Sequence, residues 1–367
     1  MNRSTLTILL IALLISCVGV LSIYSSTYQK EGESWKLIFK RQIFWIFLGA
    51  LFFLLLSSLN YRRLWDATFF LYAMAIFFLF LVFFLGSVRL GAQRWIRIGW
   101  FNFQPSELTK IIIVIFLARY FSTKSLSDIS LKVGKFGIMR AFILPFLFIA
   151  LPVGLVIEQP DLGTGLLIIV IFVATMFLSG VRLKYLFLIL CSVMVSLPVL
   201  WHFLRDYQRD RIMVFLNPNI DPLGAGYTVI QSKIAIGSGG VFGKGWLSGT
   251  QSQLYFLPES HTDFIFATFT EEWGLFGALL LLFLYFILIK EGIGIASRTN
   301  DHFGKFLAFG ISLMLGTQIL INIAMNLGLA PVVGIPLPLM SYGGSSLLVT
   351  FISLGILANI GKSRQVF

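Results

Sequence analysis

Hydrophobic positions along the chain gather into runs about as long as a membrane-spanning helix. A helix needs about 20 apolar residues to cross a bilayer, and such runs recur from one end of the sequence to the other. They do not alternate with the period of two that marks a β-barrel strand, so each run predicts a helix. We predict ten spanning helices, at residues 5–24, 42–59, 67–87, 107–121, 138–157, 164–180, 184–203, 264–289, 305–327 and 344–361. The predicted fold class is therefore all-α: a polytopic membrane protein, taken as one domain over residues 1–367.

Composition agrees with this pattern. The chain is 57% hydrophobic and only 12% charged, whereas soluble domains carry about twice that charged fraction. The formal net charge of +12 is explained by basic residues at helix ends, so we predict no nucleic-acid partner. Cys17 and Cys191 lie inside apolar runs and predict no disulfide framework. The first run also resembles a signal peptide, but the residues before Cys17 fit a cleavage site poorly, and we interpret it as a retained first span.

The distribution of Lys and Arg predicts the orientation. With the N-terminus inside, the inner side holds about twice as many Lys and Arg as the short outer loops. Both termini are therefore predicted to be cytoplasmic. The one long loop, residues 204–263, then lies outside the cytoplasm between the seventh and eighth helices. It is rich in Gly and aromatic residues with low net charge, which does not favour disorder.

Most acidic residues fall on the outer side in this topology, so acid chemistry is expected there. The stretch FLPESHTDFIFA places Glu259 and Asp263 directly before the eighth span. Aspartate is a leading helix cap, and on the residues alone capping is favoured for Asp263. In QPSELTK, Glu107 and Lys110 share one helix face. A lysine inside an apolar span requires a cavity or an anion, so structural and functional roles stay equally open for this pair.

Three further stretches carry turn, aromatic or charge signals. EQPDLGTG (158–165) predicts a tight turn in which Asp161 caps the next helix. RLGAQRWIRIGW (89–100) fits either interfacial anchoring by tryptophan or a phosphate-binding arginine cluster. Residues 326–346 hold three prolines and four glycines without a charge, which predicts a packed or re-entrant loop over a cavity. No metal-ligand spacing, P-loop or Ser–His–Asp pattern is present.

Four long motifs resemble the SEDS family (shape, elongation, division and sporulation proteins). They are FQPSELTK (103–110), EQPDLGTG (158–165), GTQSQLYFLPESHTDFIFATFTEEWGLFG (249–277) and PLMSYGGSS (338–346). Their order and the ten predicted spans match the family over essentially the whole chain. The motif GTQSQLYFLPE is typical of the family's rod-shape, RodA-type branch.

The resemblance implies a peptidoglycan glycosyltransferase of the bacterial cytoplasmic membrane. Such an enzyme polymerises lipid II, the undecaprenyl-pyrophosphate-linked disaccharide-pentapeptide, on the outer face during cell elongation. Its implied partners are a class B penicillin-binding protein transpeptidase and other elongation-complex membrane proteins. The family's essential aspartate falls on Asp263, its glutamate and lysine on Glu107 and Lys110, and its loop arginine on Arg94. Asn102 departs from the arginine that rod-type relatives often carry.

An inverting transfer from a pyrophosphate donor sets the chemistry that we expect. It needs a base on the acceptor hydroxyl and positive charge near the leaving group, but not the paired carboxylates of glycoside hydrolysis. We predict Asp263 as the general base. Glu259, Asp161, Arg211 and Lys233 join the family positions as candidate substrate-binding residues. No cofactor is certain, although a divalent cation (Mg or Mn) could assist; a lipid II flippase and a non-enzymatic scaffold are the alternatives.

Overall fold

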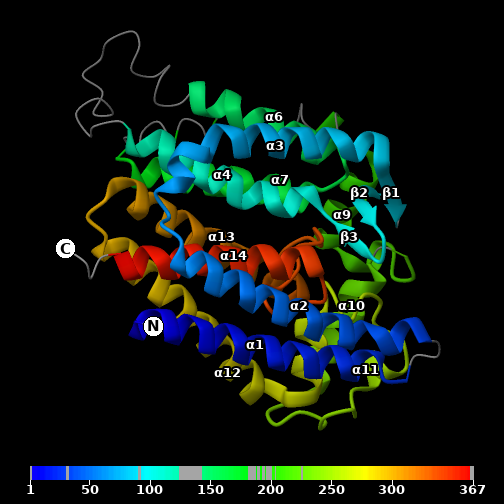
Figure 1. Cartoon of the computed structure of the whole chain (residues 1–367). Helices are drawn as coiled ribbons and strands as arrows, with labels where there is room; N and C mark the ends of the chain where they lie inside the picture. The colour runs from blue at the N-terminus through cyan, green and yellow to red at the C-terminus, as the bar shows by residue number, and fades with distance from the viewer. Residues whose placement is uncertain are drawn as a thin grey trace. The chain divides into compact units, whose positions relative to one another are not determined.

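The apolar runs form helices in the computed structural model, which describes residues 2–29, 33–89, 92–123, 143–180, 187, 191, 195, 201–202, 204–224 and 226–363. The helices that cover the predicted spans are α1 (Arg3–Thr27), α2 (Glu33–Ser58), α3 (Arg63–Leu85), α4 (Pro105–Ser122), α6 (Leu144–Glu158), α7 (Leu162–Leu178), α12 (Ile265–Arg298), α13 (His302–Leu327) and α14 (Gly344–Ser363) (Figure 1). The predicted span at 184–203 lies almost wholly outside the described residues.

Length and hydropathy make this a polytopic membrane protein, as predicted. Among the described residues, six helices are long and apolar enough to cross a membrane, namely α1, α2, α3, α12, α13 and α14, and α6 and α7 are shorter apolar helices. The helices α2 and α12 extend beyond the predicted spans. Hydropathy marks the apolar core of a spanning helix, whereas the helix itself continues through its polar end turns.

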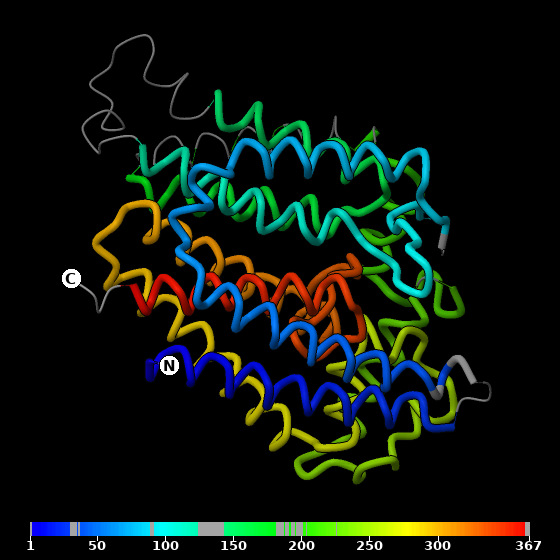
Figure 2. The backbone as a smooth tube through the Cα atoms, viewed as in Figure 1, coloured from blue at the N-terminus to red at the C-terminus, as the bar shows by residue number. Residues whose placement is uncertain are grey.

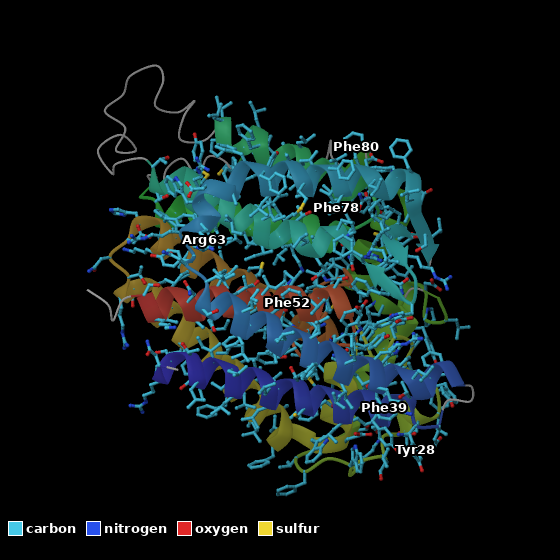
Figure 3. All side chains as sticks on the ribbon, viewed as in Figure 1. Tyr28, Phe39, Phe52, Arg63, Phe78 and Phe80 are labelled. Atoms are coloured by element: carbon cyan, nitrogen blue, oxygen red, sulfur yellow. The ribbon has the colours of Figure 1, made fainter. Side chains whose placement is uncertain are left out.

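Large apolar side chains cover the outer faces of these helices. Phe70 and Phe84 on α3 are 72% and 78% exposed, and Figure 3 shows Phe80 of the same helix on the surface. Phe78 instead packs edge-on against Phe103, with ring centroids 5.6 Å apart. Exposed rings of this density are expected where acyl chains rather than water surround the helices.

The chain forms two compact units. Unit 1 comprises Met1–Leu54, Leu204–Glu291 and Leu315–Ile352, and unit 2 comprises Leu55–Phe203, Gly292–Met314 and Ser353–Phe367. The prediction that residues 1–367 form a single domain is not tested by this division into units. In unit 2, α3, α4, α6 and α7 pack side by side, as the tube trace in Figure 2 shows.

A small antiparallel sheet in unit 2 includes the stretch at residues 89–100, for which interfacial anchoring and phosphate binding both stay predictions. Its strands β1 (Gly86–Arg89), β2 (Ala92–Ile98) and β3 (Phe101–Phe103) pair in the order β1-β2-β3. They pack at the ends of α3 and α4 (Figure 1). Ala92 and Ile96 are buried and lie on one face of β2. Arg94 has the same parity along β2 as these two residues and is partly buried, so the arginines do not mark a separate polar face of the strand.

The long loop of unit 1 folds into short regular elements. These are α9 (Asp206–Leu216), a 3₁₀ turn η2 (Pro218–Ile220), α10 (Tyr227–Ser238) and α11 (Thr250–Gln253). Residues Ala235, Leu257, Phe264 and Ala267 form a buried core cluster in this region. This cluster joins α10 to the beginning of α12, so the segment that carries Asp263 rests on packed side chains.

The helix α12 is interrupted at Gly274, and a loop of unit 1 compensates for the interruption. Gly274 has φ 66° and ψ −165°, a region that only glycine adopts readily. The loop at residues 240–245 bonds to the main-chain groups on both sides of the break. The four bonds are Lys244 N to Glu271 O (3.0 Å), Gly245 N to Glu272 O (3.0 Å), Leu275 N to Gly240 O (2.9 Å) and Phe276 N to Val241 O (3.1 Å). A broken helix at membrane depth is stable only when its freed groups are bonded in this way.

Two buried carboxylates strengthen this contact. Glu271, which is 0% exposed, accepts hydrogen bonds at Oε1 from Lys244 Nζ at 2.7 Å and from Thr250 Oγ1 at 3.0 Å. Glu272 accepts a short hydrogen bond from the hydroxyl of Ser25 on α1. The acids that the sequence places inside the eighth span therefore tie the loop and α1 to the broken helix.

Replacing Gly274 with alanine is expected to destabilise the protein by about 2 kcal/mol or more. A Cβ at this position would lie 2.6 Å from Val241 O and in hard contact with Gly243 N, which are both main-chain atoms. Thermal unfolding of the detergent-purified variant measures the loss. Gly294→Ala is the matched control, because Gly294 lies in the same helix and a Cβ added there would have nothing within 4 Å. An equal melting temperature for the two variants would contradict this account.

Candidate functional site

Asp263 lies immediately before α12 in unit 1. The helix begins at Ile265, so Phe264 occupies the N-cap position and Asp263 precedes it. The Asp263 side chain is partly exposed, whereas Phe264 and Ile265 are buried. The residue that the family resemblance selects therefore lies just before the helix and is partly exposed.

The main chain of residues 260–263, here called the Asp263 segment, is held at each carbonyl oxygen. The donors are Thr268 Oγ1 to Ser260 O (3.2 Å), Tyr342 N to His261 O (2.9 Å), Ser341 Oγ to Thr262 O (2.7 Å), and both Asn322 Nδ2 and Asn326 Nδ2 to Asp263 O (3.0 Å each). These donors come from α12, from α13 and from the charge-free stretch before α14. The segment is therefore fixed from three directions.

The charge-free stretch at 326–346 packs within unit 1, as its composition predicts. Ile335 O accepts a hydrogen bond from Asn322 Nδ2 at 2.8 Å, and Ser341 O accepts one from Gln42 Nε2 at 3.1 Å. Its prolines remove main-chain donors that would otherwise need partners in a buried loop. The stretch acts as a rigid support for the Asp263 segment.

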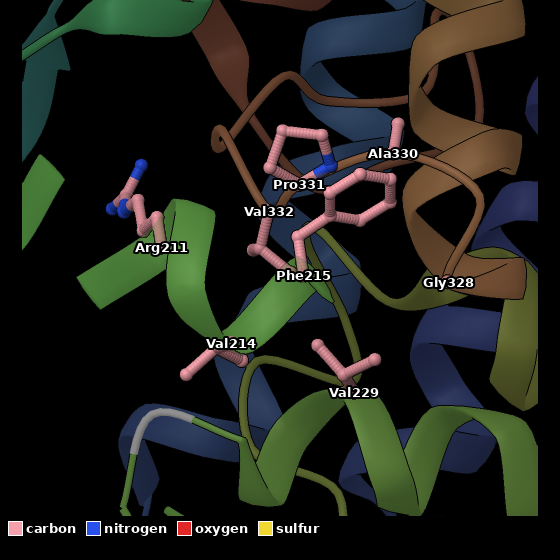
Figure 4. A pocket seen from close by; sticks show the side chains of 8 residues that line it. All are labelled: Arg211, Val214, Phe215, Val229, Gly328, Ala330, Pro331 and Val332. Atoms are coloured by element: carbon pink, nitrogen blue, oxygen red, sulfur yellow. The ribbon is translucent and has the colours of Figure 1, made fainter. Parts of the chain in front are cut away.

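Part of this stretch also lines a mainly apolar pocket of unit 1 (Figure 4). The pocket is lined by Arg211, Val214, Phe215, Val229, Gly328, Ala330, Pro331 and Val332. Figure 4 shows Phe215 beside Pro331 and Val332, with the Arg211 guanidinium on the α9 side. The predicted cation Arg211 therefore borders an apolar surface.

Lys233 reaches the same end of α13. Its Nζ lies 2.5 Å from where a Cβ on Gly328 would be, and Gly328 has φ 70°. Glycine is needed there because the left-handed backbone and the lysine chain leave no room for a side chain. Lys233 therefore packs against Gly328, which also lines the pocket that Arg211 borders.

Glu259 shapes the turn ahead of Asp263. It has φ 50°, its side chain is exposed, and its Oε2 accepts a hydrogen bond from Thr262 Oγ1 at 2.9 Å. Its carbonyl accepts hydrogen bonds from Thr262 N and Phe264 N at 3.1 and 3.3 Å. These contacts favour a role for Glu259 in holding the loop conformation, and substrate binding by it stays a prediction.

Glu107 and Lys110 form a buried ion pair in unit 2. Lys110 Nζ donates to Glu107 Oε1 at 2.7 Å, one turn into α4. The two residues are only 2% and 1% exposed. Two full charges are therefore withdrawn from water, and each depends on the other for compensation.

Arg94 and Asp161 belong to a second polar cluster of unit 2, the Asp161 cluster. Asp161 caps α7 as predicted, accepting from Thr164 N at 3.3 Å. It also accepts hydrogen bonds from Ser106 Oγ at 2.8 Å and Gln104 Nε2 at 3.2 Å. Arg94 lies 3.9 Å from Asp161 and donates to the carbonyls of the preceding turn, at Gln159 O (3.1 Å) and at Pro160 O. These contacts favour structural roles, and phosphate binding by Arg94 stays a prediction.

No group of three or more His, Cys, Asp or Glu side chains that could hold a metal ion occurs among the residues that the structure describes. A divalent cation that assists the reaction therefore remains a prediction, and the described residues contain no such set of protein ligands for it.

Asn322 and Asn326 are the residues that sequence reasoning missed. They lie one turn apart in the apolar helix α13, and both are buried. A pair of amides at i and i+4 inside a spanning helix was the available signal, because polar groups in such helices require specific partners.

Comparison with known proteins places the whole chain in one family. A family model described as a cell cycle protein, covering FtsW, RodA and SpoVE, matches residues 4–366. The peptidoglycan glycosyltransferase MrdB of Escherichia coli K12 is 44% identical over 98% of this chain and 94% of its own. A probable peptidoglycan glycosyltransferase FtsW of Geobacter sulfurreducens (strain DL-1 / KN400) is 37% identical over 98% and 95%.

Solved structures agree. A chain from a study of how a peptidoglycan synthase complex coordinates polymerization and crosslinking is 29% identical, with a TM-score of 0.81 over 97% of both chains. The rod shape determining protein RodA of Thermus thermophilus gives a TM-score of 0.70 at 27% identity, over 97% of this chain and 96% of that one. With the family match over residues 4–366, the 44% identity and the shared fold, the chain belongs to the SEDS family of FtsW, RodA and SpoVE.

Proposed function

We propose that this chain is a peptidoglycan glycosyltransferase that polymerises lipid II into β-1,4-linked glycan during cell elongation. Family membership and the activity named for MrdB support the reaction class. The observation that carries the proposal is the placement of Asp263: an acid directly before a membrane helix, with its main chain held by buried donors. RodA as a structural relative supports the elongation role.

The proposed reaction is an inverting transfer. The acceptor hydroxyl oxygen attacks the anomeric carbon of the donor sugar as the bond from that carbon to the pyrophosphate oxygen breaks. Asp263 takes the hydroxyl proton, and the bond's electron pair leaves with the undecaprenyl pyrophosphate. Pyrophosphate is already a good leaving group, so no general acid is required. Catalysis then depends on one positioned carboxylate and on positive charge near the phosphates.

Lys233 and Arg211 are our candidates for that charge within unit 1. The Lys233 side chain packs against Gly328, and Arg211 and Gly328 both line the apolar pocket of unit 1. A pyrophosphate attached to a long isoprenoid combines an anionic group, which cations bind, with an apolar chain, which an apolar surface binds. We retain a divalent cation as an auxiliary that the pyrophosphate itself would bind. Glu107 and Lys110 stay substrate-binding candidates on the family resemblance.

Purified protein supplied with lipid II tests this function. We expect glycan polymer without any other protein. A flippase would instead move labelled lipid II across vesicle membranes and yield no polymer. A scaffold would do neither, and its effect would appear only as stimulation of a separate polymerase. Absence of polymer in every preparation of folded protein would reject the proposal.

We propose a class B penicillin-binding protein transpeptidase as the partner. The support is a structural relative that comes from a complex coordinating polymerization and crosslinking. Adding the cognate transpeptidase to the assay should convert linear glycan into crosslinked product. The proposed location is the cytoplasmic membrane with both termini inside, as the Lys and Arg distribution predicts. A reporter fused after residue 367 that is active only outside the membrane would reject this orientation.

A further inference from the structure

Two buried asparagines of α13 hold the main chain of Asp263. Asn322 Nδ2 and Asn326 Nδ2 each donate to the Asp263 carbonyl oxygen at 3.0 Å, and both residues are 0% exposed. Asn322 uses its second amide hydrogen on Ile335 O at 2.8 Å. A buried amide is tolerated only when its donors and acceptors are matched, so these contacts define where each side chain lies.

Asn326 also performs the capping that the sequence favours for Asp263. Its Oδ1 accepts a hydrogen bond from Ala267 N at 3.1 Å. Ala267 is the third residue of α12, whose N–H has no partner within the helix. A side chain just before the helix normally supplies that acceptor. Because Asn326 of α13 supplies it here, the N–H of Ala267 has an acceptor other than the Asp263 carboxylate.

The position of Asn326 is itself rigid. It lies in the last turn of α13, which ends in a Schellman motif: Leu329 N donates to Ala324 O at 2.7 Å, and Gly328 N to Met325 O at 3.1 Å. Ser232 Oγ of α10 donates to Asn326 O at 2.8 Å. Asn326 thus links the end of α13 and α10 to the beginning of α12.

We propose that Asn326, supported by Asn322, is a positioning residue that sets where the Asp263 carboxylate meets the acceptor hydroxyl. The inference rests on the proposed function, in which Asp263 is the general base. Both amides bond to one carbonyl, so losing either one shifts the Asp263 segment without releasing it. A shift of about 1 Å in a reacting group lowers a rate about 100-fold.

The test compares Asn326→Ala and Asn322→Ala with Asn359→Ala. Asn359 is a matched control in unit 2: it is buried, its Nδ2 donates to Ser57 O at 2.9 Å, and its Oδ1 accepts from Tyr61 N at 3.0 Å. We measure lipid II polymerisation per folded, monodisperse molecule. For Asn326→Ala we expect kcat to fall about 10- to 100-fold, with KM changed less than about threefold. The kcat of Asn359→Ala should equal that of the wild type even though its melting temperature falls.

The outcomes separate this proposal from the proposed function. Wild-type kcat in both Asn326→Ala and Asn322→Ala, alongside an inactive Asp263→Asn, overturns the positioning role and leaves the general base intact. An active Asp263→Asn overturns the general base. A kcat loss in Asn359→Ala equal to that of Asn326→Ala also overturns the positioning role.

Two further comparisons test the positioning role, and the first does so even if Asn326→Ala does not fold. If Asn326→Ala does not yield folded protein, Asn322→Ala decides, because it leaves the bond of Asn326 to Ala267 in place. In the Asp263→Asn background, Asn326→Ala should lower the residual turnover no further. An additional 10-fold loss there would overturn a role exerted through Asp263.

Discussion

Asp263→Asn is expected to lower kcat for lipid II polymerisation by about 10²- to 10⁴-fold, the usual contribution of a positioned general base. Asparagine keeps the shape of the side chain but does not accept the proton of the acceptor hydroxyl. The variant should fold normally, because the segment is held through its main-chain carbonyls and the helix is capped by Asn326. The measurement is polymer formation at saturating lipid II, with the melting temperature recorded on the same preparation.

Two companions sharpen this experiment. Asp263→Glu retains a carboxylate one methylene farther out and should show intermediate turnover. Asp206→Asn is the control acid of the same unit: its side chain is 99% exposed, and its 3.8 Å contact with Arg209 is a surface pair worth little. Polymerisation by Asp263→Asn at the wild-type rate would remove Asp263 from the chemistry, and a loss of activity in Asp206→Asn would show that the assay reports on protein quality.

The helical frame was predictable because hydrophobic length is a strong signal in membrane proteins. The spans that become α1, α3 and α13 follow from apolar runs alone. The sheet β1-β2-β3 was missed because its arginines suggested the membrane surface. The burial of Ala92 and Ile96 on one face of β2 became visible only with the strand pairing.

The break in α12 could not be predicted, since it depends on a partner distant in sequence. Gly274 is only one more glycine in an apolar run until residues 240–245 bond to both sides of it. Charge placement was equally ambiguous. The sequence marks Arg94 as a cation beside an acid, but only the structure shows its guanidinium on the carbonyls of Gln159 and Pro160.

The candidate site also has parts that the sequence predicts and parts that only the structure shows. The resemblance selects Asp263, and local residue preferences suggest that it is a cap. The long-range contacts of Asn322 and Asn326 supply one capping acceptor from α13 and hold the Asp263 carbonyl, and the spacing of residues in α12 does not predict them. The amide pair in α13 is a signal in the sequence, but the carbonyl that it holds becomes visible only when the fold is known.

Lys110→Met is expected to destabilise the protein by about 3–5 kcal/mol, because it leaves the buried Glu107 carboxylate without its cation. The pair lies at 2.7 Å with both residues almost fully buried. Glu107→Gln should cost a similar amount by leaving the ammonium uncompensated. Thermal unfolding of the detergent-purified variants measures both losses.

The double variant Glu107→Gln with Lys110→Met separates structure from function. Removing both charges together should restore stability to within about 1 kcal/mol of the wild type, since a buried pair is often replaceable by neutral groups of similar size. If the pair also binds the lipid-linked substrate, the restored protein stays inactive with a raised KM. A stable double variant with wild-type turnover would show that Glu107 and Lys110 have a structural role only and do not bind the substrate. A double variant as unstable as Lys110→Met alone would show that the cost lies in lost lysine contacts and not in the unpaired charge.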